Sequence, residues 1–82
     1  MRRSRVHVTN RYLFLILADG RSYRIPRDLT PRLADATENQ IRRWRFTGPA
    51  FIPTGIHWPD LDEDLAINET LDEFQLSPAD ED

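Results

Sequence analysis

The feature that most constrains the fold is an apolar strand followed by a tight-turn dipeptide and a shorter second strand. Residues 11–18 place aromatic and branched side chains on one face and leucines on the other, so both faces are apolar. Such a strand is central in its sheet or is covered on one face by a second chain. Asp19-Gly20 supplies a pair suited to positive φ in a hairpin turn. Residues 21–25 form the return strand, which Pro26 ends.

Helix signals follow the hairpin. Thr30-Pro31 provides the N-cap and the first helical residue of a short turn. Residues 37–40 read Thr-Glu-Asn-Gln, a capping box that predicts a second helix with Ile41 and Trp44 on its buried face. Gly48 is expected to stop this second helix.

The remaining segments complete the predicted domain. Residues 5–9 alternate as a strand. Residues 51–58 are expected to add a strand to the hairpin, broken or bulged at Pro53 and Gly55. Two prolines in this region argue that the strand lies at a sheet edge. Asn68 is expected to cap a short final helix. The prediction is a single α+β domain over residues 1–76, in which a small antiparallel sheet, the β-hairpin plus a further strand, packs with two or three short helices. Residues 77–82 are predicted to be a disordered acidic tail.

Length and composition limit the function classes. A chain of 82 residues buries only roughly 60% of its unfolded surface, so its core is small. The absence of cysteine excludes a disulfide framework, a thiol nucleophile and a thiolate metal site. Such a core often depends on a partner or on self-association, so we expect a complex or a homo-oligomer. Neither a secretion-signal pattern nor an apolar run of about 20 residues is visible, which predicts a cytoplasmic protein without membrane contact.

Charge is divided sharply along the chain. Residues 1–48 hold all eleven basic residues, every one an arginine, and four acids, a balance of +7. Residues 49–82 hold ten acids and no base, a balance of −10, and the whole chain carries −3. Two interpretations remain open: the halves neutralise each other within the fold or a dimer, or one charged face binds a charged partner.

The sequence offers no convincing catalytic or metal-binding pattern. The consecutive acids at 62–64 lack the alternating oxygen ligands and the turn glycine of a calcium loop. In an extended chain, neighbouring side chains also point to opposite faces and do not converge on one ion. No serine lies in a nucleophile-elbow pattern, and no glycine-rich phosphate loop is present. We therefore predict a protein that is not an enzyme and that needs no cofactor and no metal.

Two arginine clusters are candidates for nucleic-acid binding. One is an N-terminal arm and the other lies at the end of the predicted second helix. Together they comprise Arg2, Arg3, Arg5, Arg42, Arg43 and Arg45. Such clusters can hold phosphates. No helix-turn-helix or ribbon-reader motif accompanies them, and the chain as a whole is acidic.

A motif in the second half carries a family resemblance. The run GIHWPDLDEDLAINETL, residues 55–71, resembles the signature of the bacterial domain of unknown function family 2442. Members of that family commonly have a glycine-rich lead-in before this motif, whereas residues 48–54 here read GPAFIPT. Upstream residues that also fit are Ala18-Asp19-Gly20-Arg21, Ile25-Pro26, Pro31-Arg32-Leu33-Ala34, Ala36-Thr37, Gln40 and Trp44-Arg45.

This resemblance implies a partner. The family is often encoded beside a small protein of domain of unknown function family 4160, in an arrangement similar to a toxin–antitoxin pair with this family as the antitoxin. The leading hypothesis is therefore a non-catalytic antitoxin that binds a small cognate toxin through its acidic half. The expected contact residues are His57, Trp58, Asp60, Asp62, Glu63, Asp64, Asp72 and Glu73. The alternative is an arginine-rich nucleic-acid-binding autoregulator that acts alone or meets operator DNA with its toxin.

Overall fold

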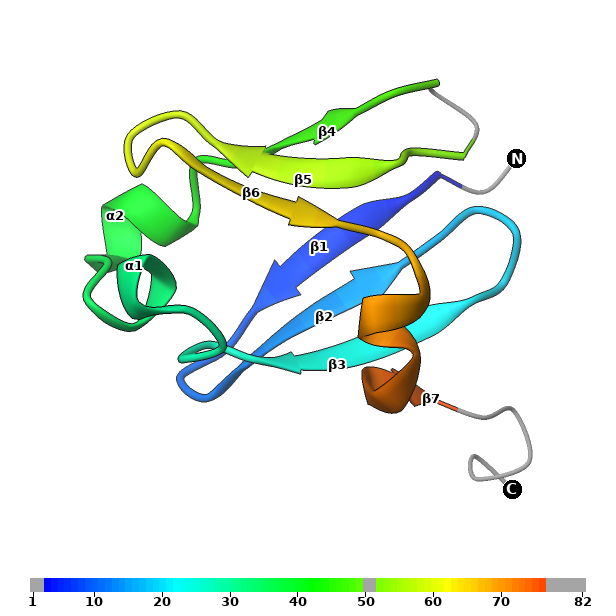
Figure 1. Ribbon diagram of the computed structural model, residues 1–82, viewed down its shortest axis with the longest axis horizontal. Helices are drawn as coiled ribbons and strands as arrows, with labels where there is room; N and C mark the ends of the chain where they lie inside the picture. Colours follow the sequence, from blue (N-terminus) through cyan, green and yellow to red (C-terminus); the bar gives the residue numbers. More distant parts are fainter. Residues whose placement is uncertain (1–2, 50–51, 77–82) are drawn as a thin grey trace.

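Two antiparallel sheets and three short helices make up the structure (Figure 1). The computed structural model describes residues 3–49 and 52–76, so the predicted tail at 77–82 lies outside the described residues. The elements are β1 (Arg5–Val8), β2 (Tyr12–Ile16), β3 (Ser22–Pro26), α1 (Pro31–Ala34), α2 (Glu38–Ile41), β4 (Arg45–Thr47), β5 (Gly55–Trp58), β6 (Glu63–Ala66), the 3₁₀ helix η1 (Glu69–Phe74) and β7 (Gln75–Leu76). The α+β class is confirmed in this coarse form.

The predicted hairpin is present as β2 and β3. The two strands pair antiparallel, with Leu13 opposite Ile25 and Phe14 opposite Arg24. Gly20 has the positive φ that the turn requires, at 101°, but Asp19 does not share it, so the prediction of a positive-φ pair was wrong for Asp19. The Asp19 carboxylate instead accepts hydrogen bonds from the backbone N–H and side chain of Arg21. The Asp19 side chain thus adds to the backbone bonds that close the turn, from the Gly20 N–H to the Leu17 carbonyl and from the Leu17 N–H to the Arg21 carbonyl.

The predicted third strand of the hairpin belongs to a different sheet, which corrects the single-sheet prediction. β1 pairs with β2 and β7 pairs with β3, so both edges of the hairpin are already occupied. β5 pairs instead with β4 and β6. We call the sheet β1-β2-β3-β7 the first sheet and the sheet β4-β5-β6 the second sheet. Figure 1 shows them as separate layers, with α1 and α2 at one end.

The capping residues in the sequence correctly predicted where both α-helices begin. The Thr30 hydroxyl accepts from the Leu33 N–H, with Pro31 as the first helical residue. At α2 both halves of the capping box form: Thr37 accepts from the Gln40 N–H, and the Gln40 side chain accepts from the Thr37 N–H. The two predicted starts are thereby confirmed.

The end of α2 was predicted too far along the chain. The helix stops at Ile41, and Arg45–Thr47 is strand β4. The reason is a long-range bond: the buried indole Nε1–H of Trp58 donates to the Ile41 carbonyl at 3.0 Å. This bond satisfies the helix end without a further turn. Gly48 has a positive φ of 86° but lies beyond β4, so it is not the helix stop that was predicted.

The second half of the chain, residues 49–82, contains two described strands that were not expected, β6 and β7. Of the consecutive acids at 62–64, Glu63 and Asp64 lie on β6, which pairs with β5. The capped final helix does form, as the 3₁₀ helix η1, with Asn68 accepting from the Thr70 N–H. Its Leu71 is buried and its Phe74 packs against the core.

The core lies between the two sheets and under the helices. The first sheet contributes alternate residues of β1, β2 and β3, and the second sheet contributes the inward face of β5. No buried side-chain polar atom of the described residues lacks a hydrogen-bond partner. The buried hydrophobic residues are Val8, Leu13, Leu15, Leu17, Tyr23, Ile25, Leu33, Ile41, Ile56, Trp58 and Leu71.

We predict that Trp58→Phe lowers the free energy of unfolding by about 2–4 kcal/mol, because it leaves a cavity and an unpaired Ile41 carbonyl. Urea unfolding followed by circular dichroism measures this change. Trp44→Phe is the matched control, since Trp44 is only half-buried and makes no side-chain hydrogen bond within the described residues. Equal losses for the two variants would contradict the importance of the indole bond.

A pH-dependent contribution to stability is predicted at Glu38. The Arg27 guanidinium donates to the Glu38 carboxylate and lowers its pKa from the ordinary 4.5, although Glu38 is exposed. A lowered pKa in the folded state stabilises the fold above pH 4.5, and this contribution is lost as the pH falls through the folded-state pKa. Glu38→Gln should therefore lower the unfolding free energy at pH 7, with a difference from the parent that shrinks below pH 4.5.

Urea titrations of both proteins at several pH values measure this difference. Glu69→Gln serves as the control, because Glu69 has no arginine partner within the described ranges. A difference for Glu38→Gln that stays constant with pH would refute the assignment.

Candidate functional site

The β5–β6 hairpin carries most of the acids that the sequence singled out. Trp58 ends β5, and Pro59 begins a tight connection in which the Leu61 N–H donates to the Trp58 carbonyl at 3.1 Å. Asp62 follows with a φ of 50°, the only positive φ among the described non-glycine residues. Aspartate tolerates this left-handed conformation better than most residues do. The turn therefore presents Asp60 and Asp62 as exposed carboxylates in a defined geometry.

Helix α1 holds this turn in place. The guanidinium of Arg32 donates to two turn carbonyls, those of Leu61 at 3.3 Å and Asp62 at 2.5 Å. Arg32 thus bonds the backbone of the turn, and the Asp62 carboxylate is left without a guanidinium partner among the residues that the structure describes. Asp60 lies 3.6 Å from Arg43, and both side chains are exposed, so solvent screens this contact strongly.

A charged row crosses the outer face of the second sheet. Arg45 of β4 lies opposite His57 of β5, which lies opposite Asp64 of β6. The imidazole Nδ1–H of His57 donates to the Asp64 carboxylate at 2.7 Å. Ile56 and Trp58 on either side of His57 are buried, so alternation along β5 directs the His57 side chain to the outer face. From the sequence, Arg45 was a candidate for nucleic-acid binding, whereas His57 and Asp64 were expected to contact a toxin. The structure places all three in one row.

The neighbouring acid Glu63 points the other way. It lies opposite Trp58 in the β5–β6 pairing, on the inward side, and its carboxylate accepts from the Thr30 hydroxyl at 2.8 Å. Glu63 therefore anchors the hairpin to the start of α1. Trp58, also expected among the contact residues, is fully buried and belongs to the core. Two of the expected contact residues thus support the hairpin from within.

Asp72 and Glu73 lie apart from the hairpin turn. Both are exposed on η1, which follows the far end of β6 (Figure 1). The structure therefore divides the expected acidic surface into a hairpin group, Asp60, Asp62 and Asp64, and a separate pair on η1. We call the first group the hairpin acids.

The predicted arginine clusters are dispersed. Arg42 and Arg43 follow α2 rather than lying on it, and Arg45 is on β4, so the prediction of a helical cluster was wrong because α2 ends at Ile41. Arg42 lies 3.3 Å from Glu38. In the N-terminal arm, Arg3 is exposed and Arg5 lies on β1, while Arg2 lies outside the described residues.

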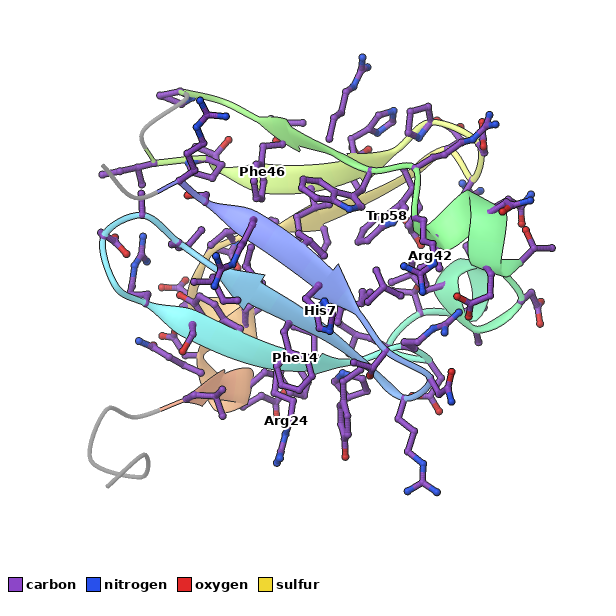
Figure 2. All side chains as sticks on the ribbon, turned by 180° about the vertical axis from the view of Figure 1, so that it is seen from behind. His7, Phe14, Arg24, Arg42, Phe46 and Trp58 are labelled. Atoms are coloured by element: carbon purple, nitrogen blue, oxygen red, sulfur yellow. The ribbon has the colours of Figure 1, made fainter. Side chains whose placement is uncertain are left out.

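A second surface was not recognised from the sequence. On the face of the first sheet that points away from the core, His7 of β1 lies opposite Phe14 of β2, which lies opposite Arg24 of β3. Figure 2 shows these three side chains in a row. Tyr12 adjoins Phe14, with ring centroids 6.1 Å apart. Alternation in the sequence indicated each strand's two faces, but the register that aligns the strands was not readable.

Neither a metal-binding cluster nor a membrane-spanning helix occurs in residues 3–49 and 52–76. No group of three histidines, cysteines or acids there has the spacing to hold a metal ion. No helix in the same part of the chain combines the length and apolar character needed to cross a bilayer.

The architecture and surfaces define a small two-sheet α+β protein whose polar and aromatic chemistry lies on the outer faces of its sheets. A family model described as "Protein of unknown function (DUF2442)" matches residues 3–75, and the chain belongs to that family. The comparisons with curated proteins and with solved structures gave no match.

Asp62 provides a test of the turn geometry. Asp62→Ala should lower the free energy of unfolding by about 1 kcal/mol, because a β-carbon without a compensating polar group is unfavourable at positive φ. Asp62→Gly should leave stability unchanged or raise it, since glycine adopts this conformation freely. Thermal unfolding of the two variants in parallel measures the contrast. Alanine and glycine variants of equal stability would show that the backbone of Asp62 is unstrained.

Proposed function

We propose that this chain is a non-catalytic interaction protein, the antitoxin of a toxin–antitoxin pair, which binds and neutralises a small basic toxin through the hairpin acids. The observation that carries the proposal is the exposed negative charge of the β5–β6 turn. Of the three hairpin acids, only Asp60 has a guanidinium partner among the described residues, and that contact is 3.6 Å long and exposed. The chain's own arginines therefore leave this surface available.

The hairpin is suited to binding because its backbone is fixed before a partner arrives. Arg32 bonds the turn carbonyls and Glu63 bonds Thr30, so both sides of the turn are tied to α1. A preorganised surface loses little conformational entropy on association. The carboxylates would guide a basic partner electrostatically. Family membership supports the proposal through the genetic pairing with family 4160 that the resemblance implies.

Asp72 and Glu73 have a supporting role in this proposal. They lie on η1, beyond the far end of β6, and add negative charge to the same half of the chain. Charges at this position strengthen long-range attraction without direct contact and are screened by salt. The proposal places the complex in the cytoplasm, without membrane contact, with homo-oligomerisation as a further element.

The charge-reversal variant Asp62→Lys/Asp64→Lys tests the contact. We expect it to lose co-purification with the small protein encoded beside it and to lose rescue of growth during co-expression, because two attractions become repulsions. Circular dichroism should show an intact fold because both side chains are exposed, although the unfolding free energy should fall, since Asp62→Lys loses the side chain that suits a positive φ and Asp64→Lys loses the bond to His57. Glu63 is left unchanged in this variant because it supports the hairpin.

Asp28→Lys/Glu69→Lys is the matched control, with the same change in net charge at two exposed acids outside the hairpin. This control should retain both co-purification and rescue. Full rescue by the hairpin variant would remove the hairpin acids from the mechanism. Loss of rescue by both variants would reduce the effect to net charge alone.

A further inference from the structure

We propose that the outer face of the first sheet binds single-stranded RNA, a role distinct from the proposed toxin contact. We call His7, Phe14 and Tyr12 the aromatic strip. The ring centroids of His7 and Phe14 are 6.4 Å apart, and those of Phe14 and Tyr12 are 6.1 Å apart. The strip is therefore continuous across β1 and β2.

The strip is flanked by guanidinium groups. The Arg24 guanidinium carbon lies 5.1 Å from the Tyr12 ring centroid, and the side chain is exposed. At the other end a shallow hollow of about 500 Å³ is lined by Arg5, Val6, His7, Phe14 and Ile16. Neither Arg5 nor Arg24 forms an ion pair with a described carboxylate.

The electrostatics of this face favour a polyanion. Strands β1, β2, β3 and β7 contain no acidic residue, although the whole chain carries −3. A negatively charged ligand thus meets no carboxylate on these four strands. Burial of Arg5 and Arg24 against an apolar surface of a protein would leave two charges unpaired, which is costly.

A single strand of nucleic acid satisfies both kinds of group together. Its bases stack on aromatic side chains, and its phosphates pair with arginine. Sheets that bind RNA in this way stack about two or three bases on exposed aromatic residues of central strands. Phe14 and Tyr12 lie on β2, which is an interior strand of the order β1-β2-β3-β7. A duplex does not fit the same face, because its bases are already stacked on one another.

RNA rather than DNA is the assigned ligand. Ser22 shares this face of the sheet, because it lies opposite Ile16 in the β2–β3 pairing. The hydroxyls of Ser22 and Tyr12 offer neutral donors and acceptors beside the arginines. A ribose 2′-hydroxyl is both a donor and an acceptor, so it provides a contact that deoxyribose lacks.

Fluorescence anisotropy with a labelled oligouridylate of about 12 nucleotides, at about 50 and 200 mM salt, tests the proposal. The parent protein should bind, and more weakly at the higher salt concentration. Phe14→Leu keeps apolar bulk but removes the ring face, and should weaken binding roughly 5- to 150-fold. Arg24→Gln, an exposed substitution without risk to the core, should weaken binding and reduce the salt slope by roughly 0.7.

Arg42→Gln and Arg45→Gln are the matched controls, since they remove the same charge outside this face; they should bind like the parent. No binding at low salt, or equal losses for Arg24→Gln and the controls, would overturn the proposal. Equal affinity for oligodeoxyuridylate would overturn the assignment to RNA. A dimer that Phe14→Leu and Arg24→Gln dissociate, without RNA binding, would assign the face to a second copy. None of these outcomes bears on the hairpin acids, so the two proposals fail separately.

Discussion

The buried hydrogen bond from the Trp58 indole to the Ile41 carbonyl is the interaction on which the rest of the structure depends. It ends α2 at the point where the chain must turn into β4, and it ties the second sheet to the helical end of the molecule. In a protein with so small a core, the free-energy cost of leaving one buried carbonyl without a hydrogen bond is a large fraction of the total free energy of unfolding. The same bond places β5 so that His57 faces outward while Trp58 faces inward.

Local signals in the sequence were sufficient for the starts of the helices, which depend on neighbouring residues. Thr30, Thr37 and Asn68 cap their helices as predicted, because capping involves residues only two or three positions apart. The β2–β3 hairpin follows for the same reason. The second sheet was missed because its central strand β5 pairs with β4, where a helix was predicted, and with β6, where no strand was predicted, and nothing local specifies that pairing.

Prediction of the candidate sites from the sequence is limited in the same way, because it does not reveal which strands pair. The outward orientation of His57 and the divergence of adjacent acids both follow from alternation along a strand, which is a local property of the sequence. The row formed by Arg45, His57 and Asp64 depends on the register of three strands. The sequence therefore assigned Arg45 to a nucleic-acid surface and the other two to a protein contact. The aromatic strip escaped notice for the same reason, since His7 and Phe14 meet only across a strand pair.

The packing of the two sheets limits thermodynamic coupling between ligands bound on their two outer faces. Layers that pack face to face direct their outer side chains in opposite directions, about 10 Å apart between backbones. Two small ligands bound at the centres of the opposite outer faces would therefore not touch each other. Any cooperativity between them must be transmitted by the side chains in between. Because those side chains are closely packed and fully buried, additivity is the simplest thermodynamic expectation for two ligands bound on opposite faces.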